Sequence, residues 1–293
     1  MEGLLYVDKP AGITSHDVVA IVRRAARSKR VGHAGTLDPF ATGLLVLAIG
    51  AYTRLLPYVN GEPKVYRATV RFGFETDTDD STGKVTVEKP APDFRATDAL
   101  QAAIGALTGT IEQIPPAFSA KHVDGVRAYK TARRGGEVTL APVQVVVHSW
   151  HVEAVAGDRV EVEIVCAGGT YIRALARDLG RAMNSAAHCE TLRRVASGSA
   201  RVEDAITMDR LAPGSIADGT VALQPPLPML GDIAQESLDD AALRDVLHGR
   251  TVAATRRGVR AALLRNDRVV GIAMRTADDR WQPKVVLAGD ADA

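Results

Sequence analysis

Cysteine is scarce in this sequence, because Cys166 and Cys189 are the two thiols in 293 residues. Two thiols cannot build a disulfide framework, and neither stands in a Cys-x-x-Cys or Cys/His grouping of the kind that holds structural zinc. Both are therefore expected to be reduced residues of the core, and no metal site is expected.

Long apolar runs are also missing. No stretch approaches the roughly 18 residues of a membrane span, and the start of the chain, Met1–Tyr6, lacks the basic and apolar regions of a secretory signal. These absences indicate a cytoplasmic protein that has no membrane partner.

Net charge is close to zero, +1 from 36 basic and 35 acidic residues, so bulk charge gives no support for a nucleic-acid partner. The distribution says more, because basic residues gather in three groups and acidic residues gather elsewhere. Each group alone could be a solvated helix face, but together they predict a locally positive surface. The basic groups are Arg23, Arg24, Arg27, Lys29 and Arg30; Arg127, Lys130, Arg133 and Arg134; and Arg173, Arg177, Arg181, Arg193 and Arg194, while one acidic loop holds Glu75, Asp77, Asp79 and Asp80.

Hydrophobic periodicity predicts a mixed α+β chain. Thr14–Asp17 fits a capping box before an amphipathic helix, and residues 65–72 and 160–166 alternate as half-exposed strands. Gly168-Gly169 then turns the chain into a helix from about Tyr171 to Met183. Strands separated by single helices, without regular βαβ alternation, favour α+β over a doubly wound sheet. A strand at 143–147 and a helix capped by Thr97 are also expected.

A second, smaller unit is expected at the C-terminal end. Prolines crowd a poorly periodic stretch between Pro213 and Pro228, which is typical of a linker or wrapping segment. A short helix at 238–247 and strand-like runs at 259–264, 269–273 and 285–287 follow it. We therefore divide the chain into domains 1–230 and 231–293, the second small and β-rich.

The run Gly32-His33-Ala34-Gly35-Thr36-Leu37-Asp38-Pro39 is the strongest candidate for a reaction centre. Two glycines three positions apart let the backbone approach a ligand closely, and Asp-Pro makes a stiff turn that presents the carboxylate outward. Such turns are common in ordinary loops, so the composition of this run would by itself favour a structural role.

The order of residues is more specific. This run, followed by Ala41-Thr42-Gly43-Leu44-Leu45, resembles the active-site motif of the TruB family of bacterial tRNA pseudouridine synthases. The resemblance implies a pseudouridine-synthase catalytic fold, with a central, largely antiparallel sheet flanked by helices, and a shortened PUA-like C-terminal domain that binds RNA. Further segments resemble the family in the same order, namely Lys9–Ser15, Lys64-Val65-Tyr66, Ser119-Ala120-Lys121, Gly125–Tyr129, Gly169–Arg173 and Leu192-Arg193-Arg194.

The activity implied by the resemblance is isomerisation of the T-loop uridine of tRNA to pseudouridine. The base is detached, turned and rejoined with no net oxidation, so no cofactor is expected. Asp38 would be the essential carboxylate, acting either as a nucleophile or as the base that opens a glycal route. Both routes need an ionised carboxylate, and Arg173 matches the family's guanidinium partner.

The same resemblance implies roles for five further residues. The uridine must be flipped out of the T loop, and Tyr66 matches the stacking tyrosine in a chain with only 4% aromatic residues. Leu192 would pack against the base, Tyr171 would bind substrate, and His33 would lie beside the displaced nucleotides. Lys9 and the basic groups would contact phosphates. Taken singly, Tyr66 and Leu192 could equally be core residues.

Two rival functions remain open at this stage. One is a guide-RNA-dependent synthase of the dyskerin-like branch, although no long basic tails for an assembly are present. The other is a non-catalytic tRNA-binding or tRNA-folding protein. The favoured interpretation implies the T arm of tRNA as the partner, no protein partner and a monomer.

Overall fold

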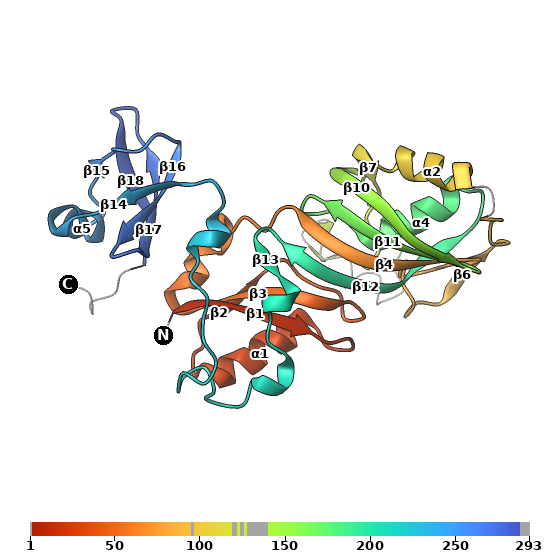
Figure 1. Cartoon of the computed structure of the whole chain (residues 1–293), viewed down its shortest axis with the longest axis horizontal. Coiled ribbons are helices and arrows are strands. Elements are labelled where there is room, and N and C mark those ends of the chain that lie inside the picture. The colour runs from red at the N-terminus through yellow and green to blue at the C-terminus, as the bar shows by residue number, and fades with distance from the viewer. Residues whose placement is uncertain (1, 95–96, 119–121, 124–125, 128–139, 288–293) are drawn as a thin grey trace.

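The computed structural model of the chain describes residues 2–94, 97–118, 122–123, 126–127 and 140–287 (Figure 1). Several segments singled out above lie outside these ranges: Ser119-Ala120-Lys121, most of Gly125–Tyr129, and the basic residues Lys130, Arg133 and Arg134. Arg127 is described by its backbone only. The second basic group therefore stays a prediction.

A nine-stranded sheet forms the main body (Figure 1). Its strand order is β1-β3-β12-β4-β11-β10-β7, with β2 paired to β3 and β13 paired to β12. The pairing of β3 with β12 is parallel and the other pairings are antiparallel, which confirms the predicted α+β class and the largely antiparallel sheet. The strands are β1 (Gly3–Lys9), β2 (Val31–Ala34), β3 (Thr42–Ile49), β4 (Lys64–Phe72), β7 (Gly109–Gln113), β10 (Val143–Ala156), β11 (Arg159–Cys166), β12 (Ala187–Ser197) and β13 (Ala200–Arg201).

The first helix, α1 (Ser15–Ala25), begins where the capping box predicts. The Thr14 hydroxyl accepts a hydrogen bond from the Asp17 backbone N–H at 3.1 Å, and the Asp17 carboxylate accepts one from the Thr14 N–H at 2.8 Å. These bonds satisfy donors that a helix start leaves free. Several β-branched residues give the segment only modest helix propensity, so the packing of Val18, Val19 and Val22 supplies much of its stability.

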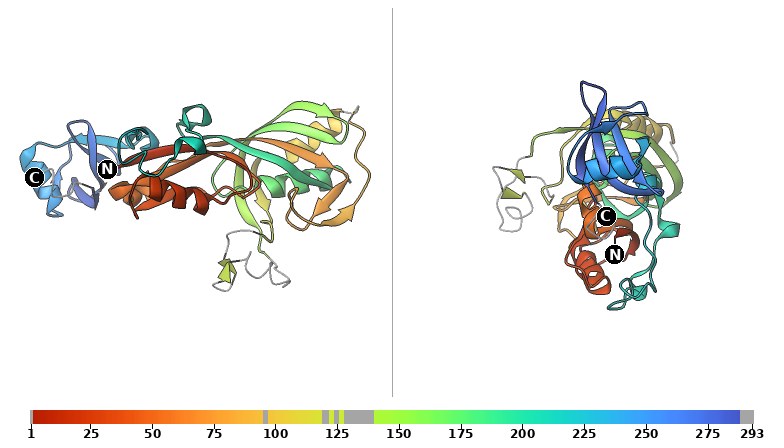
Figure 2. Two further views of the ribbon diagram at one scale, coloured as in Figure 1. Left: turned by 90° about the horizontal axis from the view of Figure 1, so that it is seen from below. Right: turned by 90° about the vertical axis from the view of Figure 1, so that its left-hand side faces the viewer.

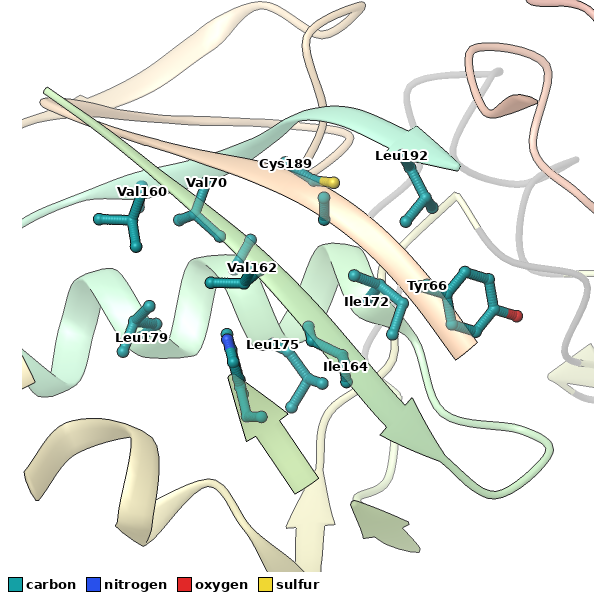
Figure 3. Packing of buried hydrophobic residues seen from close by; sticks show 14 of the residues in the cluster. Tyr66, Val70, Val160, Val162, Ile164, Ile172, Leu175, Leu179, Cys189 and Leu192 are labelled. Atoms are coloured by element: carbon teal, nitrogen blue, oxygen red, sulfur yellow. The ribbon is translucent and has the colours of Figure 1, made fainter. Parts of the chain in front are cut away.

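The largest core cluster joins helix α4 (Ile172–Ala182) to the strands that hold the pocket (Figure 3). Alternate residues of β4 and β11 are buried, as the period of two predicts. Leu175 and Leu179 of α4 belong to the same cluster as Val162 of β11, and Tyr66 lies at one end of it (Figure 3). Both cysteines are buried and unpaired in this core, as predicted.

A second helix on this half of the sheet, α2 (Thr97–Ala106), carries the expected apolar residues inward. The residues directly before Thr97 lie outside the described ranges, so its assignment as the cap stays a prediction. The strand expected at 143–147 continues to Ala156 as β10. Two small hairpins complete this part, β5 (Phe74–Thr76) with β6 (Val85–Glu88), and β8 (His122–Val123) with β9 (Val126–Arg127).

The parallel contact between β3 and β12 depends on Gly43. Its φ is +100°, and a Cβ there would stand 2.2 Å from the backbone oxygen of Arg194, which no side chain could tolerate. The glycine lets the end of β12 approach the strand that follows the Asp38 loop. Residues about 150 positions apart in the sequence thereby meet at one end of the sheet.

The C-terminal unit is a five-stranded sheet, ordered β14-β16-β17-β18-β15, with the helix α5 (Asp240–Leu247) packed on it. It lies at one end of the long axis (Figures 1 and 2) and packs on the 3-10 segment η1 (Gly50–Tyr58) through Leu55. The predicted helix and strand-like runs are present, although the last strand begins earlier than expected. The strands are β14 (Ala234–Ser237), β15 (Val252–Ala253), β16 (Arg260–Arg265), β17 (Arg268–Arg275) and β18 (Arg280–Val286).

Short 3-10 turns connect the two sheets, with η2 (Val202–Asp204), η3 (Met208–Arg210) and η4 (Leu227–Leu230) in chain order. The domain boundary expected near residue 231 falls directly after η4, and it stays a prediction. Within the described ranges, no helix is long and apolar enough to cross a membrane.

Candidate active site

A pocket of about 260 Å³ opens where the Asp38 loop, the start of β4, the start of α4 and β12 meet. Five of the seven predicted site residues line it, although they come from four separate parts of the chain. The complete lining is Gly35, Thr36, Leu37, Asp38, Lys64, Tyr66, Gly169, Thr170, Tyr171, Ile172, Arg173 and Leu192.

The loop that carries Asp38 is fastened to the first turn of α1. The Ser15 hydroxyl accepts a hydrogen bond from the Leu37 N–H at 2.9 Å and donates one to the Leu37 oxygen at 3.1 Å. Leu37 itself is buried in the main core cluster. This anchoring holds the carboxylate of the next residue at the mouth of the pocket, where its side chain is 36% exposed.

Lys9 fastens the other side of this loop. Its ammonium is fully buried and donates hydrogen bonds to the backbone oxygens of Pro10 and Ile13, both at 2.8 Å, and of Pro39 at 3.3 Å. Burial lowers the pKa of Lys9 to about 8. The expectation that Lys9 contacts phosphate is therefore wrong for this structure, because the charged end has no exposed surface and its donors serve the backbone beside Asp38.

Arg173 holds the Asp38 carboxylate from inside the protein. Its Nη2 donates a hydrogen bond to Asp38 Oδ1 at 3.2 Å, and its Nε lies 2.9 Å from Oδ2 as an ionic contact without hydrogen-bond geometry. The guanidinium is 3% exposed and also donates to the backbone oxygens of Thr78 and Phe118 at 2.6 and 3.0 Å. Five contacts, including Asp80 at 3.4 Å, fix the arginine and thereby orient the catalytic candidate.

The acidic loop lies against helix α4, which corrects the expected charge distribution. Arg173, Arg177 and Arg181 follow each other at four-residue spacing on one helix face. Arg177 pairs with Asp79 at 2.8 Å, and Arg181 makes a two-point pair with Glu75 at 2.8 and 2.7 Å. These three arginines therefore contribute little free positive charge, because carboxylates of the chain itself neutralise them. Arg193 is likewise paired, with Asp8 at 2.7 Å, and Arg194 is fully buried.

The first basic group, residues 23–30, stays on the surface. Its arginines and lysine are exposed, and no ion pair to them is found among the residues that the structure describes. Of the three predicted groups, this one provides an exposed positive surface in the described part of the chain.

Tyr66 and Leu192 line the pocket from neighbouring strands, β4 and β12 (Figure 3). Both are 7% exposed, so each is a core residue that also presents a small surface to the cavity. Burial raises the pKa of Tyr66 and outweighs the opposing effect of the nearby Arg194 guanidinium. The phenol is therefore neutral at physiological pH.

Tyr171 caps the start of α4 and lines the pocket, and the buried Gln113 side chain holds its backbone on both sides. Gln113 Oε1 accepts a hydrogen bond from the Tyr171 N–H at 2.8 Å, and Nε2 donates to the Tyr171 oxygen at 3.0 Å. This pair of bonds fixes the backbone two residues before Arg173.

His33 is the second predicted site residue that does not line the pocket. It lies in β2, two residues before Gly35, with a half-buried ring whose pKa is lowered by burial and by the charge of Arg194. The imidazole is therefore neutral, and its contact with displaced nucleotides stays a prediction.

Sequence reasoning missed four residues that shape the site: Ser15, Asp80, Gln113 and Lys64. Ser15 ends the Lys9–Ser15 segment and Asp80 belongs to the acidic loop, but their contacts with Leu37 and Arg173, like that of Gln113 with Tyr171, depend on the fold and leave no signal in the sequence. Lys64 was quoted only as the first residue of a segment, and its position two residues before Tyr66 on β4 was the available signal, because alternate strand residues share a face.

Solved structures share this fold. "Crystal Structure of a Cbf5-Nop10-Gar1 Complex" has a TM-score of 0.71 at 23% identity, covering 98% of this chain and 85% of that chain. Residues 23–172 match "TruB family pseudouridylate synthase (N terminal domain)", and residues 173–224 match "tRNA pseudouridylate synthase B C-terminal domain". The fold and the site thus define the class of pseudouridylate synthases.

Curated relatives narrow this class. The chain is 42% identical to the tRNA pseudouridine synthase B of Thermobifida fusca over 98% of this chain and 99% of the relative. It is 41% identical to the protein of the same name from Gloeobacter violaceus, again over 98% of this chain and 99% of the relative. The chain belongs to the TruB family.

Proposed function

We propose that this enzyme converts the T-loop uridine of tRNA, uridine-55, into pseudouridine, with Asp38 as the essential carboxylate. The curated relatives carry the tRNA part of this proposal through their names. The observation that carries the chemistry is the two-point contact between Asp38 and the buried Arg173, directly beside Tyr66 and Leu192 in one pocket.

The pocket suits a single nucleotide that has left its stack. Flipping a base out costs a few kcal/mol, and stacking on an aromatic ring returns roughly 1 to 3 kcal/mol. Tyr66 offers such a ring, and Leu192 offers an apolar surface from the neighbouring strand. Together they would hold the uracil while its bond to the ribose is exchanged.

Asp38 then meets the ribose or base of that nucleotide in its ionised form. The N1–C1′ bond breaks, the uracil turns, a C5–C1′ bond forms, the proton on C5 leaves and N1 takes up a proton, so atoms and charge balance without a redox step. Asp38 acts either as a nucleophile or as the base of a glycal route. The neutral phenol of Tyr66 lies in the same pocket and can take part in proton movement only by giving or relaying a proton.

The deciding experiment maps pseudouridine in an unmodified tRNA transcript treated with the purified protein alone. We expect one modified position, in the T loop, with no guide RNA present. Asp38→Asn should bind the transcript within a few fold of wild type and form no pseudouridine, while Asp98→Asn, an exposed carboxylate on α2, serves as the matched control. Normal conversion by Asp38→Asn refutes the catalytic assignment, and modification of another arm refutes the substrate.

The same assay separates the rival functions. Activity without guide RNA excludes a dyskerin-like dependence, and loss of turnover on Asp38→Asn excludes a purely binding or folding role. We further propose that the enzyme works in the cytoplasm as a monomer without a protein partner, and that residues 231–293 form a second, RNA-contacting domain. Light scattering of the enzyme–tRNA complex tests the monomer, and deletion of residues 231–293 should weaken tRNA binding more than turnover.

A further inference from the structure

Two cations that the mechanism does not use lie beside Gly35 at one wall of the pocket. Lys64 Nζ and Arg194 Nη1 each lie 3.4 Å from the point where a Cβ on Gly35 would stand. Lys64 and Gly35 line the pocket, and Arg194 lies directly behind them. Arg173 and Asp38 form a separate ion pair, so this pair of cations is a second charged feature of the cavity.

No ion pair joins either cation to a carboxylate in the described part of the chain, although the Glu62 carboxylate is close enough to act on the charge of Lys64, and Arg194 also bonds to Tyr66. Arg194 is fully buried and donates to the backbone oxygens of Leu44 and Gly35, but its Nη1 has no hydrogen-bond partner there. Lys64 forms no ion pair with the described residues, and the nearby Glu62 carboxylate instead accepts a bond from the Gly168 N–H at 2.8 Å. Burial and the charge of Arg194 lower the pKa of Lys64.

This arrangement is unfavourable unless an anion joins it. A buried N–H without an acceptor costs free energy, and two like charges across one glycine repel each other. A bound anion would offset the repulsion, because it accepts a hydrogen bond from Lys64 and its charge is attracted to the buried guanidinium of Arg194.

We propose that Lys64, backed by Arg194, binds a backbone phosphate adjacent to the everted nucleotide. The inference rests on the proposed function and names a contact of the same site. A phosphodiester is charged before, during and after the reaction, whereas the uracil carries charge only while its glycosidic bond is broken. A pair of cations fixed at one wall therefore matches the phosphate, with the ribose then lying between this wall and Asp38.

The test combines substitution of Lys64 with replacement of a single phosphate by a neutral methylphosphonate in a T-arm RNA. The methylphosphonate stands on either the 5′ or the 3′ side of the target uridine. All proteins carry Asp38→Asn so that the RNA is not converted, and the protein with this change alone is the parent. We expect Lys64→Met to lose about tenfold to a hundredfold in affinity. Lys64→Arg should stay within a few fold of the parent. One of the two methylphosphonates should weaken the parent by a similar factor and leave Lys64→Met almost unaffected.

Controls distinguish this contact from a folding defect or a general charge effect. Lys84→Met removes an exposed lysine outside the pocket and should change affinity little. The melting temperature of Lys64→Met should be no lower than that of the parent, since the change removes a charge that repels Arg194 and breaks no ion pair. The slope of log affinity against log salt should fall by about one phosphate contact.

Two results overturn the proposal. One is that Lys64→Met and each methylphosphonate weaken affinity independently, so that their effects add. If Lys64 contacts one of the phosphates, removing the lysine and removing that charge abolish the same contact, and their effects on affinity do not add. The other is unchanged affinity of Lys64→Met together with a slower single-turnover rate in the Asp38 protein, which would assign the cations to the base. If the wild-type protein, with Asp38 intact, forms pseudouridine but either result appears, only the proposed phosphate site is refuted. If the wild-type protein forms no pseudouridine, the proposed function itself is refuted.

Discussion

Replacing Arg173 by lysine keeps the charge but removes the fork that holds Asp38. The arginine uses Nε and Nη2 on Asp38 and also satisfies the backbone oxygens of Thr78 and Phe118. A lysine has one nitrogen and reaches some of these acceptors but not all. Each lost bond from a buried charged donor costs about 1.5 to 3 kcal/mol, and the partly exposed Asp38 recovers part of its loss from water. We expect Arg173→Lys to lower the free energy of unfolding by about 2 to 4 kcal/mol.

The rate should fall further than the stability suggests, because a misplacement of about 1 Å at a reacting group costs about a hundredfold. Release of tritium from C5-labelled uridine in a T-arm RNA, under single-turnover conditions, measures this step. Arg181→Lys is the matched control, since Arg181 lies on the same face of α4 and pairs with Glu75 but does not touch Asp38. Its side chain is 55% exposed, so the change should cost less than about 1 kcal/mol and leave the rate unaltered. Equal rates for Arg173→Lys and wild type would refute the positioning argument.

Three further changes test the neighbouring contacts. Ser15→Ala leaves the buried N–H and oxygen of Leu37 without their hydrogen-bond partner. We expect urea unfolding to show a loss of about 1 to 3 kcal/mol in stability, together with slower turnover. An unchanged rate would mean that the loop keeps its shape without this hydrogen bond. Tyr66→Phe should bind T-arm RNA within a few fold of wild type in a fluorescence titration, whereas Tyr66→Ala should lose roughly 1 to 3 kcal/mol of stacking, and equal affinities of the two variants would contradict a stacking role. Between about pH 8 and 10.5 the unfolded chain still binds the Lys9 proton while the folded protein has released it. The stability of the wild type relative to Lys9→Met should therefore rise with pH across this window. Urea midpoints of both proteins at pH 7 and pH 10 check the sign, and a stability difference that falls with pH would refute it.

The charge pattern shows where reading along the chain misleads. Arg173, Arg177 and Arg181 suggest a positive helix face, and the acidic loop at residues 75–80 suggests a separate negative patch. In the folded protein the two oppose each other, and their charges cancel at the back of the active site. Nothing in one-dimensional spacing indicates this pairing, because about 95 residues separate Arg173 from the loop.

Lys9 shows the same limit for a single residue. A lysine in a motif that resembles an RNA-modifying family is readily assigned to phosphate, but its three acceptors are backbone oxygens brought together by the loop before α1 and the turn after Asp38. Lys64 is the opposite case, since a lysine one strand period from Tyr66 could have been placed on the same face as the tyrosine and therefore near the pocket.

The sequence by itself determined the helices α1 and α4, the strands β4 and β11, the mixed class of the fold and the family, because local periodicity, caps and an ordered set of motifs are properties of neighbouring residues. Only the tertiary structure decided which charges are free. Burial and pairing depend on segments far apart in the chain, and these contacts neutralised the α4 arginines, enclosed Lys9 and left Lys64 facing the pocket.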